Sequence, residues 1–414
     1  MASVVVIGTL DTKLRELLFL CDRISEAGAT TVLIDVGRYP IDHPAIATSP
    51  ADLLSRYAAQ TDIHPLTRAQ YIELISGCAS QEIEGLLRNG RIHGVVSAGG
   101  SGNTSLASGV MRRALPLGFP KLIVSTMASG DTGPTIGETD ITLMYSVVDV
   151  AGLNHVLRQV LANAGAAIAG AARAYADRHS LQEAPQPPSR KRVAISMFGV
   201  TTPGVDAIRE HLEATYPVET LVFHATGHGG RAMENAIREG HVDAVIDLTT
   251  TEICDYIVGG VLSAGEGRLD AAVEAGIPNI VSLGALDMCN FGPMATVPDN
   301  FRARKLYAHN KDITLMRTSP GECEKIGDFI CRKLMRAKSP ATTELWIPRG
   351  GLSAISVPGG PFADQEADQV LFATIERGLQ GSGILVVNNP ADVNDHGFSR
   401  SIAETVIDKM GLRK

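Results

Sequence analysis

The chain has 414 residues, of which 44% are hydrophobic and 20% are charged, so it is not a disordered protein and has enough apolar residues for packed cores. Its 37 basic and 45 acidic residues give a net charge of −8, which argues against a nucleic-acid-binding surface. A chain of this length favours two domains over one.

The first half alternates short apolar runs with segments of helical periodicity. Strands are predicted at 4–7, 31–36, 94–98, 121–125 and 142–147. Helices are predicted at 12–27 and 67–89, from about residue 104, and at 154–177. Residues 38–66 hold several prolines and no sustained period, which predicts an irregular excursion.

Residues 179–191 are polar and rich in proline, and we interpret them as a linker between domains. The alternation then restarts, with strands predicted at 193–197, 218–224, 244–248, 279–283, 313–316, 353–357 and 384–387. Helices are predicted at 204–214, 230–239, 252–258, 322–336 and 365–377, and a last one ends near 410. Short, nearly continuous apolar strands that alternate with helices are typical of parallel sheets covered on both faces. We therefore predict two doubly wound, mostly parallel, Rossmann-like α/β domains, 1–178 and 192–414.

The cellular setting follows from the cysteines and the apolar runs. The six cysteines are scattered without a Cys-x-x-Cys pair, which is typical of buried free thiols in a reducing cytosol. The N-terminus lacks the basic residues of a signal peptide, and no stretch reaches 18 uninterrupted apolar residues. We expect a cytoplasmic protein with no membrane-spanning helix.

Three polar loops follow strands in the first half. In the first, residues 8–13, Asp11 can cap a helix while Lys13 and free N–H groups can hold an anion, although a capped helix with a solvated lysine fits equally well. In the third, residues 126–133, Asp131 can bind a ribose hydroxyl or a magnesium ion, or can only cap a turn.

The second loop, residues 97–105, carries the strongest signal, because it is richer in glycine and hydroxyl groups than a structural turn needs. Its successive N–H groups can converge on a phosphate at the start of a helix. Neither Gly-Lys-Ser/Thr nor Gly-x-Gly-x-x-Gly spacing is present, so it is not a standard nucleotide fingerprint. The candidate phosphate-binding residues are Gly99, Gly100, Ser101, Gly102, Asn103 and Thr104.

In the second half, histidines and carboxylates follow the predicted strands. His224, His228, Glu252 and His396 are candidates for acid–base chemistry, but they share no recognised metal-ligand spacing, and capping or solvated roles fit each of them singly. Cys254 lies on an apolar helical face and is expected to be a buried thiol rather than a nucleophile.

Four segments together resemble, in order, an uncharacterised bacterial and plant family that shares the ATP-binding domain of the tomato mosaic virus resistance protein. They are residues 8–13, 97–104, 227–230 and 357–361. The resemblance implies a two-domain α/β protein that binds ATP, with magnesium, in its N-terminal domain and forms a homodimer. The matching positions for nucleotide contacts are Thr9, Asp11, Lys13, Gly99, Gly100, Ser101, Gly102, Asn103 and Thr104. The plant relative has a further barrel domain for which 414 residues leave no room, so its antiviral role is not expected here.

Taken together, the sequence predicts ATP binding at the strand ends of the N-terminal domain, facing the interdomain cleft. The loop 99–105 would hold phosphates, Lys13 would neutralise charge, and Asp131 or a hydroxyl group would help to hold Mg²⁺. Three alternatives stay open: an enzyme that also binds a small carboxylate or phosphorylated metabolite, a non-enzymatic nucleotide-dependent regulator, and a sugar-phosphate enzyme that does not use ATP.

Overall fold

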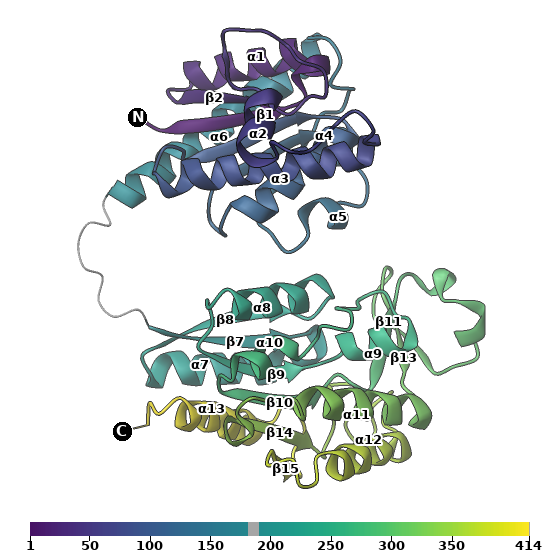
Figure 1. Ribbon diagram of the computed structural model, residues 1–414. Coiled ribbons are helices and arrows are strands. Elements are labelled where there is room, and N and C mark those ends of the chain that lie inside the picture. The colour runs from purple at the N-terminus through teal and green to yellow at the C-terminus, as the bar shows by residue number, and fades with distance from the viewer. Residues whose placement is uncertain (181–189, 414) are drawn as a thin grey trace. The chain divides into compact units, whose positions relative to one another are not determined.

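The computed structural model describes residues 1–180 and 190–413, and the chain divides into two compact units, Met1–Pro187 and Pro188–Lys414. Figure 1 shows the sheet of each unit with helices on both of its faces. Most of the predicted linker, 179–191, lies outside the described residues; the last helix of the first unit ends at Ser180 and the first strand of the second begins at Lys191.

The N-terminal unit is built on one six-stranded sheet. Its strands are β1 (Ser3–Gly8), β2 (Thr30–Asp35), β3 (Ile46–Thr48), β4 (Gly94–Gly99), β5 (Lys121–Ser125) and β6 (Thr142–Tyr145). Its helices are α1 (Leu10–Glu26), α2 (Pro50–Tyr57), α3 (Arg68–Arg88), α4 (Ser101–Ala114), α5 (Gly133–Ile136) and α6 (His155–Ser180). All neighbouring strands are parallel, in the order β3-β2-β1-β4-β5-β6. This order reverses between β1 and β4, which is where ligands bind in open α/β sheets.

Alternation along β1 builds a core on each face of this sheet. Val4 and Val6 pack with the apolar faces of α1 and α6, whereas Val5 and Ile7 pack with those of α3 and α4. A central strand buried on both faces must be apolar throughout, and the sequence of β1 meets that requirement.

The C-terminal unit repeats the architecture with a second six-stranded parallel sheet, ordered β15-β14-β10-β9-β7-β8. Its strands are β7 (Lys191–Met197), β8 (Val218–His224), β9 (Ala244–Thr249), β10 (Asn279–Gly284), β14 (Thr343–Pro348) and β15 (Leu385–Asn389). A small antiparallel sheet contains β11 (Met288–Phe291), β12 (Leu306–Ala308) and β13 (Thr314–Arg317). The helices are α7 (Thr202–Thr215), α8 (His228–Arg238), α9 (Glu252–Val258), α10 (Asp270–Ala275), α11 (Pro320–Leu334), α12 (Gln365–Gly378) and α13 (His396–Lys409). Short 3₁₀ turns are η2 (Gly199–Thr201), η3 (Met294–Thr296), η4 (Asp299–Phe301) and η5 (Pro340–Thr342).

The predicted fold class is confirmed. The strand expected at 313–316 is present as β13, in the antiparallel sheet. Two other element predictions were wrong. The strand expected at 353–357 is a loop, and the strand that joins the main sheet there is β14. The excursion 38–66 is not wholly irregular, because it contains β3 and α2.

Two further predictions concern the cysteines and membrane-spanning helices. All six cysteines are buried and free, Cys254 among them, and burial raises the pKa of its thiol, as expected of an inert core residue. Within residues 1–180 and 190–413, the helices include none with the length and apolarity needed to cross a membrane.

Candidate functional site

A pocket of about 390 Å³ lies at the carboxyl ends of β1 and β2 and at the start of α4. The carboxyl ends of the strands form this edge of the sheet, and the pocket lies beside the point between β1 and β4 where the strand order reverses. Its volume falls in the usual range for small-molecule sites. The lining residues are Thr9, Asp11, Thr12, Val36, Arg38, Tyr39, Arg68, Tyr71, Ile72, Gly102, Asn103 and Leu106.

The start of α4 is shaped by glycines that allow close approach. A Cβ atom on Gly99 would lie 2.7 Å from the Cβ of Asn103, so only glycine fits there. A Cβ atom on Gly102 would lie 2.9 Å from a terminal nitrogen of Arg68, which places that guanidinium against the first turn of the helix. Both the helix N-terminus and this arginine attract anions.

Two of the predicted phosphate ligands, Asn103 and Thr104, hold the loops together. The Asn103 side chain accepts a hydrogen bond from the N–H of Thr9 at 3.3 Å and donates one to Ser97 at 2.8 Å. The buried hydroxyl of Thr104 pairs with that of Ser125 at 2.7 Å. These contacts join the ends of β1, β4 and β5 and fix the loop from which the first turn of α4 starts.

Aspartates hold the loop that follows β2. Asp11 does not cap α1; its Oδ2 accepts hydrogen bonds from the N–H groups of Arg38 at 3.1 Å and Tyr39 at 3.3 Å. Asp35, fully buried at the end of β2, accepts from Leu10 at 3.0 Å and from Gly37 at 2.8 Å, and burial raises the pKa of its carboxyl group. The two carboxylates therefore position one wall of the pocket.

The structure brings only part of the predicted set to the pocket. Of the predicted nucleotide contacts, the residues that line it are Thr9, Asp11, Gly102 and Asn103. The residues that do not are Lys13, Gly99, Gly100, Ser101, Thr104 and Asp131. Asp131 is exposed and accepts a hydrogen bond from the N–H of Gly133 at 3.0 Å, as a turn-capping aspartate does.

Eight of the twelve lining residues were not among the predicted contacts, and Arg38, Tyr39 and Tyr71 are three of them. Tyr39 is 71% exposed at the pocket wall, and the Arg38 guanidinium lies over the Tyr71 ring at 5.5 Å. Arg38 also donates to the carbonyl of Leu66 at 2.9 Å, and Tyr71 donates to that of Gly37 at 2.6 Å. The sequence signal that could have found Arg38 and Tyr39 is their place shortly after β2, at the edge of the sheet where ligands bind.

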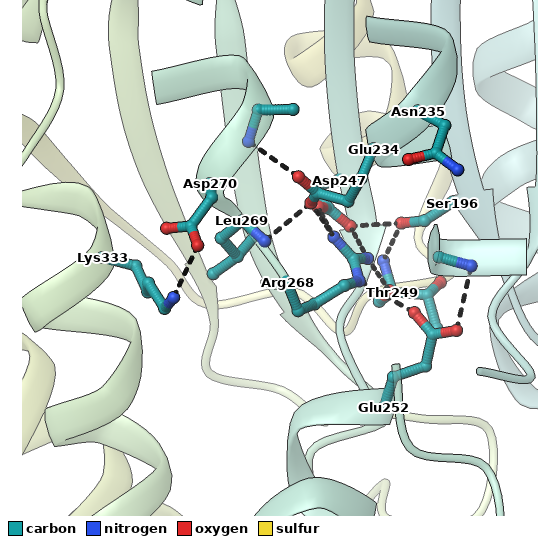
Figure 2. Close-up of polar contacts among 12 residues, drawn as sticks. Ser196, Glu234, Asn235, Asp247, Thr249, Glu252, Arg268, Leu269, Asp270 and Lys333 are labelled. Atoms are coloured by element: carbon teal, nitrogen blue, oxygen red, sulfur yellow. Dashed lines mark hydrogen bonds and ion pairs between the residues drawn. The ribbon is translucent and has the colours of Figure 1, made fainter. Parts of the chain in front are cut away.

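In the C-terminal unit, Glu252 belongs to a buried ion network rather than to an open site (Figure 2). Its Oε2 accepts a hydrogen bond from Arg268 at 2.8 Å, and its Oε1 accepts from the N–H groups of Gly227 at 2.6 Å and Gly230 at 3.0 Å. Arg268 also pairs with Asp247, which in turn accepts from the Ser196 hydroxyl. The Glu252 carboxylate is fully buried and holds the start of α8 through these N–H groups. This structural role replaces the predicted acid–base role.

The glycines around His228 serve the same network. A Cβ atom on Gly230 would overlap the Glu252 carboxylate, at 2.0 Å from Oε2, and Gly227 has a positive φ of +85°. His228 is exposed and lies 3.0 Å from the Arg231 guanidinium.

The other two candidate histidines are exposed on different elements. His224 ends β8, the edge strand, and its ring lies 5.7 Å from that of Phe198 at a tilt of 50°, whereas His396 begins α13. In the part of the chain that the structure describes, no hydrogen bond or ring contact joins His224 to His396. Their predicted catalytic roles stay predictions.

A buried aspartate gives the C-terminal unit a testable pH dependence. Asp287, just beyond β10, is fully buried; its Oδ2 accepts from the Ser353 hydroxyl at 2.8 Å, and its Oδ1 finds no partner among the described residues. Burial raises the pKa of this carboxyl group to about 6 from an ordinary 3.8, against the opposing effects of Arg317 and Ser353.

Because the folded-state pKa of Asp287 is raised, the folded protein binds this proton more tightly than the unfolded chain does, so stability from this group falls as pH rises from about 4 through 6. Asp287→Asn removes that loss. Relative to the unmodified protein, we expect the variant to gain roughly 1–3 kcal/mol of unfolding free energy between pH 4 and pH 8. Urea denaturation at both pH values measures it, and parallel pH profiles for the two proteins would contradict the assignment.

Comparison with known proteins identifies the family. Models of the N-terminal and C-terminal domains of an uncharacterised protein family, UPF0261, match residues 2–177 and 190–410. The chain belongs to the UPF0261 family. A UPF0261 protein of Clostridium tetani is 42% identical over 99% of both chains. The family also includes the ToMV susceptible protein tm-1(GCR26) of Solanum lycopersicum, 38% identical over 97% of this chain and 55% of the tomato protein. The predicted family resemblance is confirmed.

Among solved structures, similar folds include MurG of Acinetobacter baumannii and the UDP-GlcNAc 2-epimerase of Methanocaldococcus jannaschii. MurG is 11% identical with a TM-score of 0.23, over 68% of this chain and 79% of its own. The epimerase is 9% identical with a TM-score of 0.22, over 68% of this chain and 83% of its own. At these scores the similarity supports no conclusion about the ligand or reaction of this UPF0261 member.

Proposed function

We propose that the N-terminal unit binds an adenine nucleotide in the pocket at the ends of β1 and β2, with its phosphates at the start of α4. The observation that carries the proposal is Arg68, which lines the pocket against Gly102 and forms no hydrogen bond or ion pair with any described residue. A cation left unpaired beside a helix N-terminus is suited to an anionic ligand.

The first turn of α4 supplies the other half of the phosphate site. This helix has 14 residues and begins after Gly100 with no side-chain cap, so its first N–H groups are left for a ligand or for water. The helix dipole adds positive potential at the same point. A phosphate there would meet N–H donors and the Arg68 guanidinium together.

The remaining walls suit a base. Val36, Ile72 and Leu106 are apolar, and the exposed ring of Tyr39 stands at the pocket wall. An aromatic ring can stack on the face of any nucleotide base, and apolar walls exclude water from that face. The two kinds of wall together favour a nucleotide over a bare sugar phosphate, which would leave the apolar walls without a partner.

Magnesium is part of the proposal only through the phosphates. In residues 1–180 and 190–413, no group of three His, Cys, Asp or Glu side chains is placed to hold a metal ion. Mg²⁺ at nucleotide sites needs only one or two carboxylates, because phosphates and water complete its shell. Asp11 is the one carboxylate among the described residues that line the pocket. The predicted second substrate and the homodimer stay predictions.

A thermal-shift series on the full chain tests the ligand class. We expect ATP, ADP and AMP to raise Tm, ribose 5-phosphate to raise it less, and Mg²⁺ to enlarge the effect of ATP, since a ligand that binds only the folded state stabilises it. An equal shift with ribose 5-phosphate and AMP would favour the sugar-phosphate alternative. No shift with any nucleotide would refute the proposal.

A further inference from the structure

We propose that residues 352–358 form a hinged strap over a second ligand site, in the C-terminal unit. When the strap opens, this site binds a small molecule that carries an amino or hydroxyl group on an apolar body. The inference concerns a different unit from the nucleotide pocket and does not depend on nucleotide binding.

The strap lies where a parallel sheet offers a ligand site. From β7 the chain goes to β8 on one side, and β9 lies on the other side of β7, so the strand order reverses there. Ligands of open α/β sheets bind beyond the carboxyl ends of the strands at such a point. Here the N–H of Ala354 donates to the carbonyl of Val200, after β7, at 3.0 Å. The N–H of Ala285, directly after β10, donates to the carbonyl of Leu352 at 2.7 Å. Because β9 lies between β7 and β10, the strap crosses its end.

The strap fills the site with the groups that a ligand would supply. The fully buried hydroxyl of Ser353 donates to Oδ2 of Asp287 at 2.8 Å. The Ile355 side chain packs against an apolar cluster. The buried members of this cluster are Val200, Ala285, Met288, Leu315 and Phe362. The closed site therefore already accommodates a hydroxyl group beside a branched apolar group, and this pair defines the ligand class.

Asp287 supplies an independent observation that points to a ligand. Its side chain is fully buried just beyond β10, and its Oδ1 has no hydrogen-bond partner among the described residues. A buried acceptor without a donor is destabilising. An amino or hydroxyl group beneath the open strap can donate to this oxygen and can replace Ser353 at Oδ2. Binding then satisfies an acceptor that the closed strap leaves without a donor.

Glycines at both ends of the strap suit a hinge. Gly350 and Gly351 precede it, and Gly359 and Gly360 follow it. Gly351 and Gly359 have positive φ values of +151° and +83°, which other residues rarely adopt. A Cβ atom on Gly359 would meet nothing within 4 Å in the described chain, so backbone conformation rather than packing explains this glycine.

The strap is tied together internally and closed against backbone strain. Oγ of Ser356 accepts hydrogen bonds from the N–H groups of Leu352 and Ser353, both at 2.9 Å, so the segment can move as one piece. Ala285, which donates to Leu352, is held at a φ of +57°. A non-glycine residue keeps such a conformation only where its surroundings impose it. These features favour a segment with a closed and an open state.

Hydrogen exchange of backbone amides in the full chain tests the opening. A strap that opens locally releases the amides of Ala285 and Ala354, whereas the amides of a central strand exchange only through larger unfolding. Ala285 is as fully buried as Leu345 and Ile347 in β14. We expect the amides of Ala285 and Ala354 to exchange at least tenfold faster than those two β14 amides. Exchange at Ala285 as slow as in β14 would overturn the proposal.

Two matched glycine variants test the hinge. Alanine disfavours the left-handed conformation, so Gly359→Ala should weaken the closed state and accelerate exchange at Ala285 and Ala354 at least fivefold. Gly381→Ala is the control, because Gly381, in the turn before β15, has a similar φ of +76° and the same open space around its Cβ position. It should leave both rates unchanged. Equal exchange rates in the two variants would overturn the hinge.

Leucinol is the probe for the ligand class, because it carries an amino and a hydroxyl group on an isobutyl group. It matches the space of Ser353 and Ile355, and a molecule of this size is expected to bind with a roughly millimolar Kd. It should accelerate exchange at Ala285 and Ala354, because a ligand that binds only the open form raises the population of that form. Asp287→Asn should weaken leucinol binding at least fivefold.

The acidic counterpart of this probe is 4-methylpentanoate, whose carboxylate the Asp287 carboxylate repels, so we expect no binding and no change in exchange. Absence of leucinol binding, or an equal effect of the two probes, would overturn the ligand site. Neither result bears on the nucleotide pocket, which the thermal-shift series tests separately.

Discussion

Replacing Arg268 with methionine is expected to destabilise the protein by about 3–5 kcal/mol at pH 8, because breaking a buried ion pair leaves an uncompensated charge. The Arg268 side chain is 1% exposed and lies among three carboxylates, of Asp247, Glu252 and Glu234, that are at most 5% exposed. Arg268 donates to Asp247 at 2.6 Å and to Glu252 at 2.8 Å. Methionine fills much of the space but carries no charge.

The loss should depend on pH in a defined direction. Burial already raises the pKa of the Glu234 carboxyl group, and removing the guanidinium leaves all three carboxylates without their buried cation. Carboxyl groups with raised folded-state pKa values favour the folded state at low pH and lose that contribution as pH rises. Arg268→Met should therefore be less destabilising at pH 5 than at pH 8.

Urea denaturation at both pH values measures the effect, with Arg209→Met as the matched control. The Arg209 side chain is 38% exposed, and it forms a surface ion pair at 3.5 Å with Glu213, one turn further along α7. Arg209→Met should therefore lower the free energy of unfolding by less than about 1 kcal/mol. A change below 1 kcal/mol for Arg268→Met at pH 8 would contradict the role assigned to the network.

The fold could be predicted because its signal is local. Buried parallel strands such as β1, β4 and β9 are nearly continuous apolar runs. The segments between the strands have apolar residues at helical spacing. The sequence did not predict β14, because Thr343 and Glu344 interrupt its apolar pattern. Their burial depends on distant contacts, such as the ion pair between Glu344 and Lys409 at 2.9 Å.

The candidate site could be predicted only where its residues follow strands. Thr9, Asp11 and Gly102 come from the strand-to-helix segments after β1 and β4, which the sequence marks by glycine and hydroxyl content. Arg68 lies 34 positions before Gly102 in the chain, at the start of α3, and only the packing of α3 on α4 brings the two together. Glu252 was misinterpreted because its buried partner, Arg268, lies 16 positions later in the chain, and no local pattern connects the two.

Replacing Arg68 with glutamine is expected to weaken ATP binding at least tenfold. Among the described residues that line the pocket, this guanidinium is the cation without a hydrogen bond or ion pair. A charge-assisted hydrogen bond to a phosphate contributes roughly 1.5–3 kcal/mol, or about ten- to a hundredfold in affinity. Glutamine keeps a polar side chain, although a shorter one, and removes the charge. Lys13, predicted from the sequence to neutralise the phosphates, is not among the described residues that line the pocket, so Lys13→Gln is the matched control.

The central claim is that a nucleotide binds the N-terminal pocket with its phosphates between Arg68 and the start of α4. Calorimetric titration of ATP with Mg²⁺ into the unmodified chain, Arg68→Gln and Lys13→Gln tests it most directly. We predict one site in the unmodified protein, at least tenfold weaker binding in Arg68→Gln, and a change below threefold in Lys13→Gln. Absence of ATP binding to the unmodified protein, or undiminished affinity in Arg68→Gln, would contradict the claim.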